Sequence, residues 1–427
     1  MKLDLSVLSD DLREAMLSIC SLVDRAGGRA LMVGGSVRDL ILGVKEVKDV
    51  DLEVYGLEPE VLQRVLASRF LFDSCGLSFG VLKIKHVDID VSLPRRESKR
   101  GTGHRGFLVD SDPHLSISEA ASRRDFTINA MYYDPLVEVF EDPYRGLEDL
   151  NARRLRHVSA KFVEDPLRVL RGMQFIARFD LEAAPETIAL CRTIGMEGLA
   201  CERLWEEWGK FLLKGKALSK GLDFLVATNW IAFFPELSDI AETFTWLDFS
   251  RALDAFARLR EKFRNDALVL GLATLGRFLP SLDAVRSFLS RLTNEERILV
   301  DVPRLLDGFT HAEKLSMSAL SSSDVLRLAV RVGRIDRVVR LGEILGVDFA
   351  ALGKAANDLG VLNVAPQPLL MGRDLIAMGY KPSALFKKYL DACFEAQLDG
   401  KFTTHEGACA YFRNVIGEER KTSSSLN

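Results

Sequence analysis

The pattern of hydrophobic and polar residues is strand-like and broken by turns up to about residue 150, and almost wholly helical beyond it. The apolar run 30–33 predicts a short strand, and Gly34 and Gly35 after it predict a sharp turn. A helix is expected to begin at Ser36 or Val37. The chain is therefore expected to combine a mixed region of strands and helices with a long helical region.

A second strand is predicted in the segment 48–55, where acidic and apolar residues alternate. Successive side chains of a strand point to opposite faces, so Asp49, Asp51 and Glu53 are expected to project together while the apolar residues between them are buried. Carboxylates on one strand face are hard oxygen ligands of the kind that Mg²⁺ takes beside substrate phosphates. The segment predicts a magnesium site at Asp49 and Asp51, and a solvated strand face is the alternative.

The predicted glycine turn offers a binding place for the phosphates that would accompany a metal ion at Asp49 and Asp51. Gly34 and Gly35 open a helix whose free backbone N–H groups and positive dipole end suit a phosphate chain. A further strand pair is predicted at 81–85 and 87–93, and Asp90 lies on the polar face of its second strand. Asp90 is therefore a candidate third carboxylate for two-metal catalysis, in which two ions clamp the attacking and leaving oxygens.

Charged residues also recur every three positions at the start of the helix predicted around Pro166. Asp165, Arg168 and Arg171 are expected to lie along one side of this helix, with apolar residues over most of the rest. An arginine fork beside a carboxylate presents donors and an acceptor that can read the Watson–Crick edge of a base. Asp165 is also predicted to cap the helix, and the two roles are compatible.

Three long motifs occur in one order, at 31–43 with 48–51, then 123–131, then 164–171. Over about residues 30 to 215, and more weakly at 372–382, the sequence resembles the class II tRNA nucleotidyltransferase and bacterial poly(A) polymerase family. The resemblance implies an α+β fold: a small mixed-sheet, polymerase-beta-like nucleotidyltransferase head followed by an all-helical neck, body and tail. Family members add cytidine and adenosine to a tRNA 3′ end without a nucleic-acid template.

The resemblance also implies a domain division and a reaction. The expected domains are the catalytic head at 1–150, a helical neck with the base-selecting motif at 151–220, a helical body at 221–320 and a tRNA-binding tail at 321–427. The expected reaction adds C, A or both to the tRNA 3′ end from CTP and ATP, with Mg²⁺ as cofactor and release of pyrophosphate. The alternatives are an A-adding enzyme or poly(A) polymerase of the same family, and a catalytically inactive, nucleotide-dependent RNA-binding protein.

Individual roles follow from the matched motifs. By resemblance, Gly35 and Arg38 contact the nucleotide phosphates, Arg124 lies on the nucleotide, and the matching Asp and Arg of the third motif pair with the incoming base. The region of Asp125 and Asn129 would sense the ribose. The complete set of expected nucleotide-binding residues is Gly34, Gly35, Ser36, Arg38, Arg124, Asp125, Asn129, Asp165, Arg168 and Arg171.

The segment 94–107 is dense in Gly, Ser and cationic residues, which predicts a mobile, basic loop. By resemblance, it is the flexible loop associated with switching from C to A addition, which enzymes adding only CC tend to lack. A disordered connector is the alternative. His104 lies in this loop and receives no role in proton transfer.

A second basic feature is expected in the tail. Arg327, Arg331, Arg334 and Arg337 fall within about a third of a helix circumference, which suits a phosphate backbone. A solvated helix face is the alternative. The formal net charge of −4 does not exclude RNA as a partner, because binding depends on local potential rather than on the sum of charges.

Composition indicates the compartment. The six cysteines are scattered without a CxxC pair, so they are expected to be reduced thiols rather than disulfides or zinc ligands. Acidic residues interrupt the apolar runs of the N-terminus, so no signal peptide is expected there. The longest apolar stretch, around 267–275, is too short to cross a bilayer. A soluble, cytoplasmic enzyme without a membrane partner is the expectation.

Overall fold

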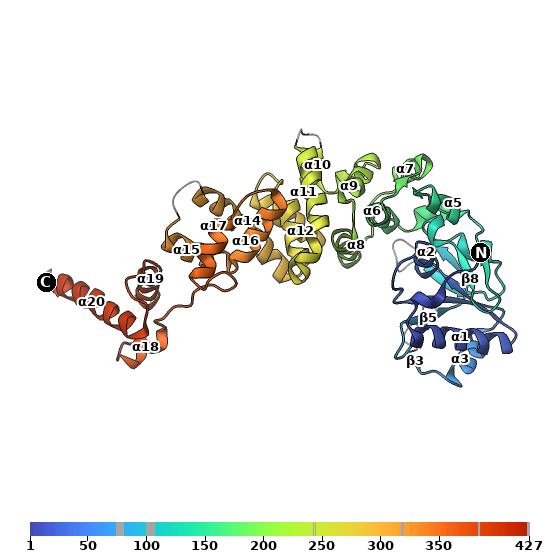
Figure 1. The fold of residues 1–427 in the computed structure, drawn as a ribbon, viewed down its shortest axis with the longest axis horizontal. Coiled ribbons are helices and arrows are strands. Elements are labelled where there is room, and N and C mark those ends of the chain that lie inside the picture. Colours follow the sequence, from blue (N-terminus) through green and yellow to red (C-terminus); the bar gives the residue numbers. More distant parts are fainter. Residues whose placement is uncertain are drawn as a thin grey trace. The chain divides into compact units, whose positions relative to one another are not determined.

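The computed structural model describes residues 1–73, 81–99, 107–241, 243, 245–316, 320–382 and 385–424. The chain forms two compact units, Met1–Glu242 and Thr243–Asn427. The first unit contains the sheets together with helices, and the described part of the second is helical (Figure 1). The predicted α+β class is confirmed, and the finer division into head, neck, body and tail stays a prediction.

A seven-stranded mixed sheet forms the centre of the N-terminal part of the first unit, in the order β3-β4-β5-β2-β1-β8-β9. Its strands are β1 (Arg29–Val33), β2 (Val50–Tyr55), β3 (Phe72–Asp73), β4 (Val81–Ile84), β5 (Ile89–Ser92), β8 (Tyr132–Asp134) and β9 (Val139–Glu141). Two smaller sheets pair β6 (Arg95–Lys99) with β7 (Phe107–Ser111), and β10 (Arg154–Leu155) with β11 (Glu182–Ala183).

Strand β2 lies inside the sheet, antiparallel to β1 and parallel to β5. The parallel register sets Asp51 directly beside Asp90. The apolar residues of β2 are buried, as predicted, but Glu53 is also buried, and Asp49 lies just before the strand rather than within it. Of the three acidic side chains expected on one exposed face, only Asp51 is therefore both on β2 and exposed.

The predicted loop at 94–107 begins and ends as paired strands, which corrects the expectation for its ends. Strands β6 and β7 pair antiparallel, with Arg95 opposite Ser111 and Lys99 opposite Phe107. The ladder satisfies backbone N–H and C=O groups in a segment whose composition alone is typical of a loop. Residues 100–106, including His104, lie outside the described residues.

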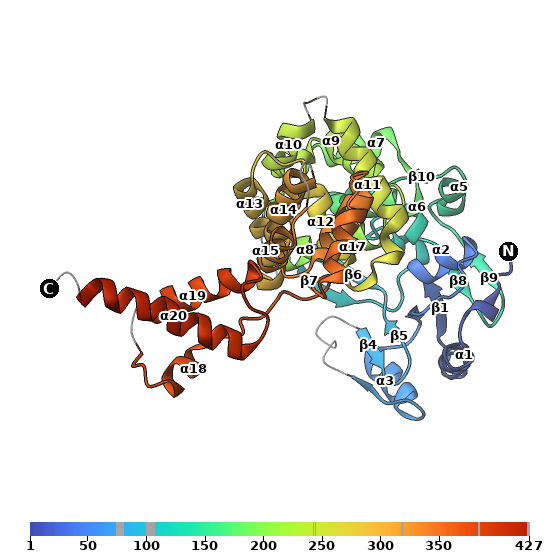
Figure 2. The same ribbon diagram turned by 60° about the vertical axis from the view of Figure 1, so that its left-hand side comes forward.

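Helices cover both faces of the seven-stranded sheet. The helices of the first unit are α1 (Asp10–Arg25), α2 (Gly35–Ile41), α3 (Pro59–Ala67), α4 (Ile117–Ala121), α5 (Gly146–Asn151), α6 (Leu167–Phe179), α7 (Pro185–Cys191), α8 (Cys201–Lys214), α9 (Leu218–Ala227) and α10 (Pro235–Ala241). Helices α1 and α3 lie on one side of the sheet and α2 on the other (Figures 1 and 2). Helix α6 packs against α8 and α9 and carries the third sequence motif.

The second unit is built around a buried apolar helix. Its helices are α11 (Trp246–Leu259), α12 (Ala267–Gly276), α13 (Leu282–Leu292), α14 (Glu296–Ser316), α15 (Ser322–Val332), α16 (Ile335–Leu345), α17 (Ala350–Asp358), α18 (Gly372–Ala377), α19 (Leu385–Leu398) and α20 (His405–Ser424). Helix α12 packs against α11, α14 and α16, and nearly all of its residues are buried. Among the described residues, no helix combines the length and the apolar character needed to span a membrane.

A buried charge cluster joins α16 to the start of α12. Asp266 is 3% exposed, and its carboxylate accepts hydrogen bonds from Arg334 at 2.9 Å, Arg337 at 2.9 Å and Arg340 at 2.7 Å. A second aspartate, Asp336, pairs with Arg334 at 2.6 Å and with Arg340 at 3.1 Å. These ion pairs therefore link α16, and the residue before it, to the segment that precedes α12.

The described cysteines carry free thiols, as expected. They are Cys20, Cys191, Cys201, Cys393 and Cys409. Cys75 lies outside the described residues.

Candidate active site

The glycine turn between β1 and α2 forms one wall of the site. Gly34 adopts a φ of +73°, which favours glycine, and Gly35 begins α2. A Cβ on Gly34 would lie 3.3 Å from Arg124 Nη1 and 3.6 Å from Asp51 Oδ2. The turn therefore brings backbone close to a cation and a carboxylate that come from different parts of the head.

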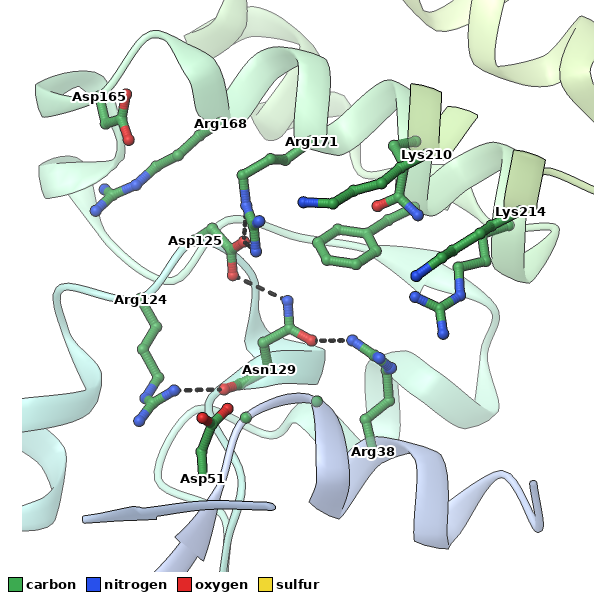
Figure 3. A pocket seen from close by; sticks show the side chains of 15 residues that line it. Arg38, Asp51, Arg124, Asp125, Asn129, Asp165, Arg168, Arg171, Lys210 and Lys214 are labelled. Carbon is green, nitrogen blue, oxygen red and sulfur yellow. Dashed lines mark hydrogen bonds and ion pairs between the residues drawn. The ribbon is translucent and has the colours of Figure 1, made fainter. Parts of the chain in front are cut away.

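A cavity of about 390 Å³ opens beside this turn (Figure 3). It is lined by Gly34, Gly35, Arg38, Asp51, Arg124, Asp125, Asn129, Asp165, Arg168, Arg171, Gln174, Phe175, Arg178, Lys210 and Lys214. Nine of the ten predicted nucleotide-binding residues are in this set. The exception is Ser36, which is buried and donates its hydroxyl to Val33 O at 3.1 Å.

The lining of the cavity is strongly cationic. Seven Arg and Lys side chains face three Asp side chains in it. This excess of positive charge in a concave site attracts a polyanion. A nucleotide triphosphate has the charge and the size that such a cavity can take.

The carboxylate of Asp51 lacks a protein cation of its own. Among the described residues, it accepts no hydrogen bond and has no Lys or Arg nitrogen within 4 Å. Partial desolvation raises the pKa of Asp51, Arg124 opposes this, and the neighbouring carboxylates of Asp49 and Asp90 add to it. An unpaired carboxylate with other carboxylates close to it favours a bound cation.

Asp90 has a different environment. Its carboxylate pairs with Lys83 at 2.8 Å. It borders a second cavity of about 210 Å³, which shares Asp51 and Arg124 with the first. The structure thus brings Asp90 next to Asp51, as the sequence predicted, but leaves it with a lysine partner.

A chain of hydrogen bonds links three of the sequence motifs along the cavity wall (Figure 3). Arg38 donates to Asn129 Oδ1, Asn129 donates to Asp125 Oδ1 at 3.0 Å, and Arg171 donates to Asp125 Oδ2 at 2.8 Å. Burial favours the neutral acid of Asp125, but Arg171 and Asn129 outweigh it and lower the pKa of Asp125. The motifs at 31–43, 123–131 and 164–171 thus form a single charged network.

The charged side chains at the start of α6 line the cavity, and hydrogen bonds and ion pairs fix their positions. Helix α6 begins at Leu167 with Pro166 at the N-cap position, one residue later than predicted, and Asp165 Oδ1 still accepts the backbone N–H of Leu167 at 3.1 Å. Arg203 on α8 also pairs with Asp165 at 2.8 Å. Arg168 donates to Lys161 O at 2.7 Å and to Arg123 O at 2.6 Å, so its guanidinium is fixed at the cavity wall.

Sequence reasoning missed the cationic residues of α8. Arg203, Glu207, Lys210 and Lys214 are spaced by four, three and four positions, which places them along one face of the helix. This polar stripe is the available signal, because the opposite face carries the buried core residues Trp208 and Leu212. Phe175 and Arg178 of α6 were missed as well.

The predicted arginine stripe of the tail is wrong as a single helix face. Gly333, with a φ of +77°, ends α15, so Arg327 and Arg331 lie on α15 while Arg334 precedes α16. Arg327 pairs with Glu395 and Asp399, Arg331 with Asp307, and Arg334 with Asp266. Their predicted RNA contacts stay a prediction.

Comparison with protein families and curated proteins gives matches to part of the chain. The family described as the poly(A) polymerase head domain matches residues 30–156. The Multifunctional CCA protein of Mannheimia succiniciproducens is 43% identical over 188 residues, which cover 42% of this chain and 43% of that protein. That of Paracidovorax citrulli is 41% identical over 215 residues, which cover 48% and 50%. The alignments thus span half the length or less of these curated relatives.

Solved structures extend the likeness along the chain. The Bacillus stearothermophilus CCA-adding enzyme in complex with CTP has a TM-score of 0.70 and 23% identity, covering 96% of this chain and all of that one. The Thermotoga maritima CCA-adding enzyme complexed with tRNA has a TM-score of 0.63 and 19% identity, covering 96% and 97%. Residues 30–156 thus match the poly(A) polymerase head-domain family, in a chain whose fold is similar to that of solved CCA-adding enzymes, as the sequence motifs predicted.

Proposed function

We propose that this chain is a tRNA nucleotidyltransferase that adds C, A or both to the tRNA 3′ end from CTP and ATP without a nucleic-acid template. One observation carries the proposal. A single cationic cavity contains the glycine turn, the unpaired carboxylate of Asp51 and the charged start of α6. The named ligands of the solved relatives, CTP and tRNA, agree in kind with this cavity.

Asp49 and Asp51 would hold Mg²⁺, and Asp90 would become a third ligand once Lys83 releases it. The unpaired state of Asp51 and the hard oxygen donors fit this cation. When bound, the ion would activate the attacking hydroxyl and neutralise charge on the phosphates. In the described part of the chain, no three His, Cys, Asp or Glu side chains meet as a complete metal site, so phosphate oxygens and water would supply the other ligands.

The remaining residues would bind and orient the substrates. The tRNA 3′ oxygen forms a bond to the α-phosphorus, and the bond from that phosphorus to pyrophosphate breaks. Arg38, Arg178, Lys210 and Lys214 offer positive charge to the triphosphate, since all four line the cavity. The second cavity beside Asp51 offers room for the acceptor end.

Asp165 and Arg168 would select the base, and Asp125 with Asn129 would contact the ribose. Replacing Arg168 by alanine is expected to lower discrimination between CTP and the other nucleotides by about 10- to 100-fold, because a paired base edge is worth about 1–3 kcal/mol. Single-turnover incorporation of each of the four nucleotides measures this. Unchanged ratios among the four rates would refute the assignment.

The loss of Arg168 also leaves two backbone carbonyls without a donor. Arg192→Ala is the matched control, since Arg192 likewise donates to a backbone carbonyl, Ala227 O, but does not line the cavity. This control is expected to keep the nucleotide ratios of the parent. A loss of discrimination in both variants would assign the effect to stability.

The tail residues Arg327, Arg331 and Arg334 would contact tRNA only by exchanging their present ion pairs for phosphates. Arg327 and Arg331 are the more exposed of the three. The four-domain division, with a tRNA-binding tail at 321–427, and a cytoplasmic location belong to the same proposal.

One experiment tests the reaction and its alternatives. Purified protein is incubated with tRNAs ending at the discriminator base, at C and at CC, with CTP and ATP supplied separately, and the products are sequenced. Addition of C and then A supports the proposal. Addition of A alone, or of long A tracts, selects the A-adding enzyme or the poly(A) polymerase. No pyrophosphate release with any primer selects the inactive RNA-binding protein.

A further inference from the structure

Glu53 is a buried carboxylate that no predicted role uses. It follows Asp51 by two residues on β2 and is 1% exposed. Its Oε2 atom lies 3.2 Å from Arg123 Nη2 and 3.3 Å from Arg124 Nη2. Its Oε1 atom accepts from Tyr55 at 2.6 Å and faces the Tyr132 hydroxyl at 3.5 Å. Both oxygens are occupied, so Glu53 is no cation ligand itself.

Arg124 has two carboxylates within reach. Its Nη1 atom and Asp51 Oδ2 lie 3.3 and 3.6 Å from the same point, the place of a Gly34 Cβ, so they are within about 7 Å of each other. Asp51 and Glu53 are two positions apart on one strand and therefore share a side of it. The guanidinium nevertheless pairs with Glu53, and Asp51 has no ion pair among the described residues.

Other contacts hold Arg124 in this orientation. Its Nε donates to the Tyr132 hydroxyl at 3.3 Å, and its Nη1 faces Asn129 O at 3.5 Å (Figure 3). The guanidinium also lies 5.3 Å from the Tyr132 ring centroid. Arginine has five N–H donors, so after these contacts it keeps donors for a ligand in the cavity.

We infer that Glu53 is a positioning residue: it holds Arg124 away from Asp51, so that the Asp51 carboxylate stays open to a divalent cation. The inference rests on the proposed cation site. Without the Glu53 charge, Arg124 would turn to Asp51, whose carboxylate lies within about 7 Å of its Nη1 atom on the same side of β2. A guanidinium on Asp51 competes with the metal for the same oxygens.

The test measures Mn²⁺ binding to the full-length protein in the absence of nucleotide, by electron paramagnetic resonance. Mn²⁺ prefers the same carboxylate and water ligands as Mg²⁺ and gives a signal when free. Glu53→Gln keeps the shape of the side chain and removes its charge. It is expected to raise the Mn²⁺ dissociation constant at least about tenfold, because an ion pair then occupies Asp51.

A double variant separates positioning from general damage. Glu53→Gln with Arg124→Gln removes the competing guanidinium and is expected to return the Mn²⁺ dissociation constant to within about threefold of the parent. Glu141→Gln breaks another Glu–Arg pair, with Arg29 at 2.7 Å, and is the matched control expected to bind Mn²⁺ as the parent does. Parent-like binding by Glu53→Gln, or no recovery in the double variant, overturns the inference.

Two further variants cover the cases in which the proposed cation site is wrong or Glu53→Gln does not fold. Asp51→Asn is expected to abolish Mn²⁺ binding; if it does not, the cation site of the proposed function fails, and not merely the role of Glu53. If circular dichroism shows that Glu53→Gln is unfolded, Glu53→Asp carries the test, since its shorter carboxylate cannot hold Arg124 as well. Its Mn²⁺ dissociation constant is then expected to rise at least about threefold, and a parent-like value overturns the inference.

Discussion

Replacing Asp51 by alanine is expected to reduce nucleotide incorporation into tRNA by at least about 10³-fold, which corresponds to about 4 kcal/mol of lost transition-state stabilisation. The physical reason is the central position of Asp51. It borders both cavities and stands directly beside Asp90 on the parallel strand β5. Its side chain has no other partner among the described residues, so its removal costs the fold little and the proposed metal site much.

Two measurements test the role of Asp51. One is single-turnover incorporation of CTP, and the other is equilibrium binding of CTP in the absence of metal. Binding is expected to change by less than about tenfold, because the seven cationic side chains of the cavity stay in place. Asp24→Ala is the control, since Asp24 is exposed on α1 and does not line the cavity. Near-normal incorporation by Asp51→Ala would exclude the two-metal mechanism.

Replacing Asp266 by alanine is expected to destabilise the second unit by about 3–5 kcal/mol, because it leaves the buried Arg337 and the half-buried Arg334 and Arg340 without one of their counter-charges. Arg334, Arg337 and Arg340 all donate to this one carboxylate. Asp283→Ala removes an exposed i, i+3 partner of Arg286 and is expected to cost less than about 1 kcal/mol. The denaturant dependence of hydrogen exchange in peptides from α12 and α16 of the full-length protein measures both.

The same cluster predicts a pH dependence. Burial raises the pKa of Asp266, but Arg337 and Arg334 outweigh it and hold this pKa below its ordinary value. A carboxylate with a lowered folded pKa contributes its full stability above the unfolded pKa of about 3.9, and loses it as the pH falls through the folded value. The difference in stability between the parent and Asp266→Ala should therefore shrink below about pH 4. A constant difference down to pH 2 would contradict the charge role.

Local sequence patterns predicted the glycine turn and the strand that carries Asp51, because both depend on interactions between residues close together in the sequence. The apolar run before Gly34, the positive φ of that residue and the alternation in β2 each depend on a few neighbouring positions. The pairing of Asp51 with Asp90 was only a candidate, because a parallel register depends on how strands separated in sequence meet. The strand pattern at 81–93 made Asp90 a candidate, and the structure supplies the register that sets it beside Asp51.

The sequence alone did not predict which charged residues pair when they are far apart along the chain. Glu53 reads as an exposed strand residue until Arg123 and Arg124 are known to approach it from 70 residues away. The tail arginines read as one stripe because Gly333 was not taken as a helix end. The deciding partners of Glu53 lie in another element, where periodicity gives no information, whereas Gly333 is a local signal within the stripe itself.

The order of strands in the head also indicates where the protein can carry an added label. Strand β2 is enclosed by β1 and β5, whereas β9 forms an outer edge and is joined to β8 by an exposed turn at Leu136 and Val137. A fluorophore or a short epitope grafted into this turn would project into solvent, several strands from Asp51. Such a conjugate would let single molecules of the protein be followed while the carboxylates of Asp51 and Asp90 stay unchanged.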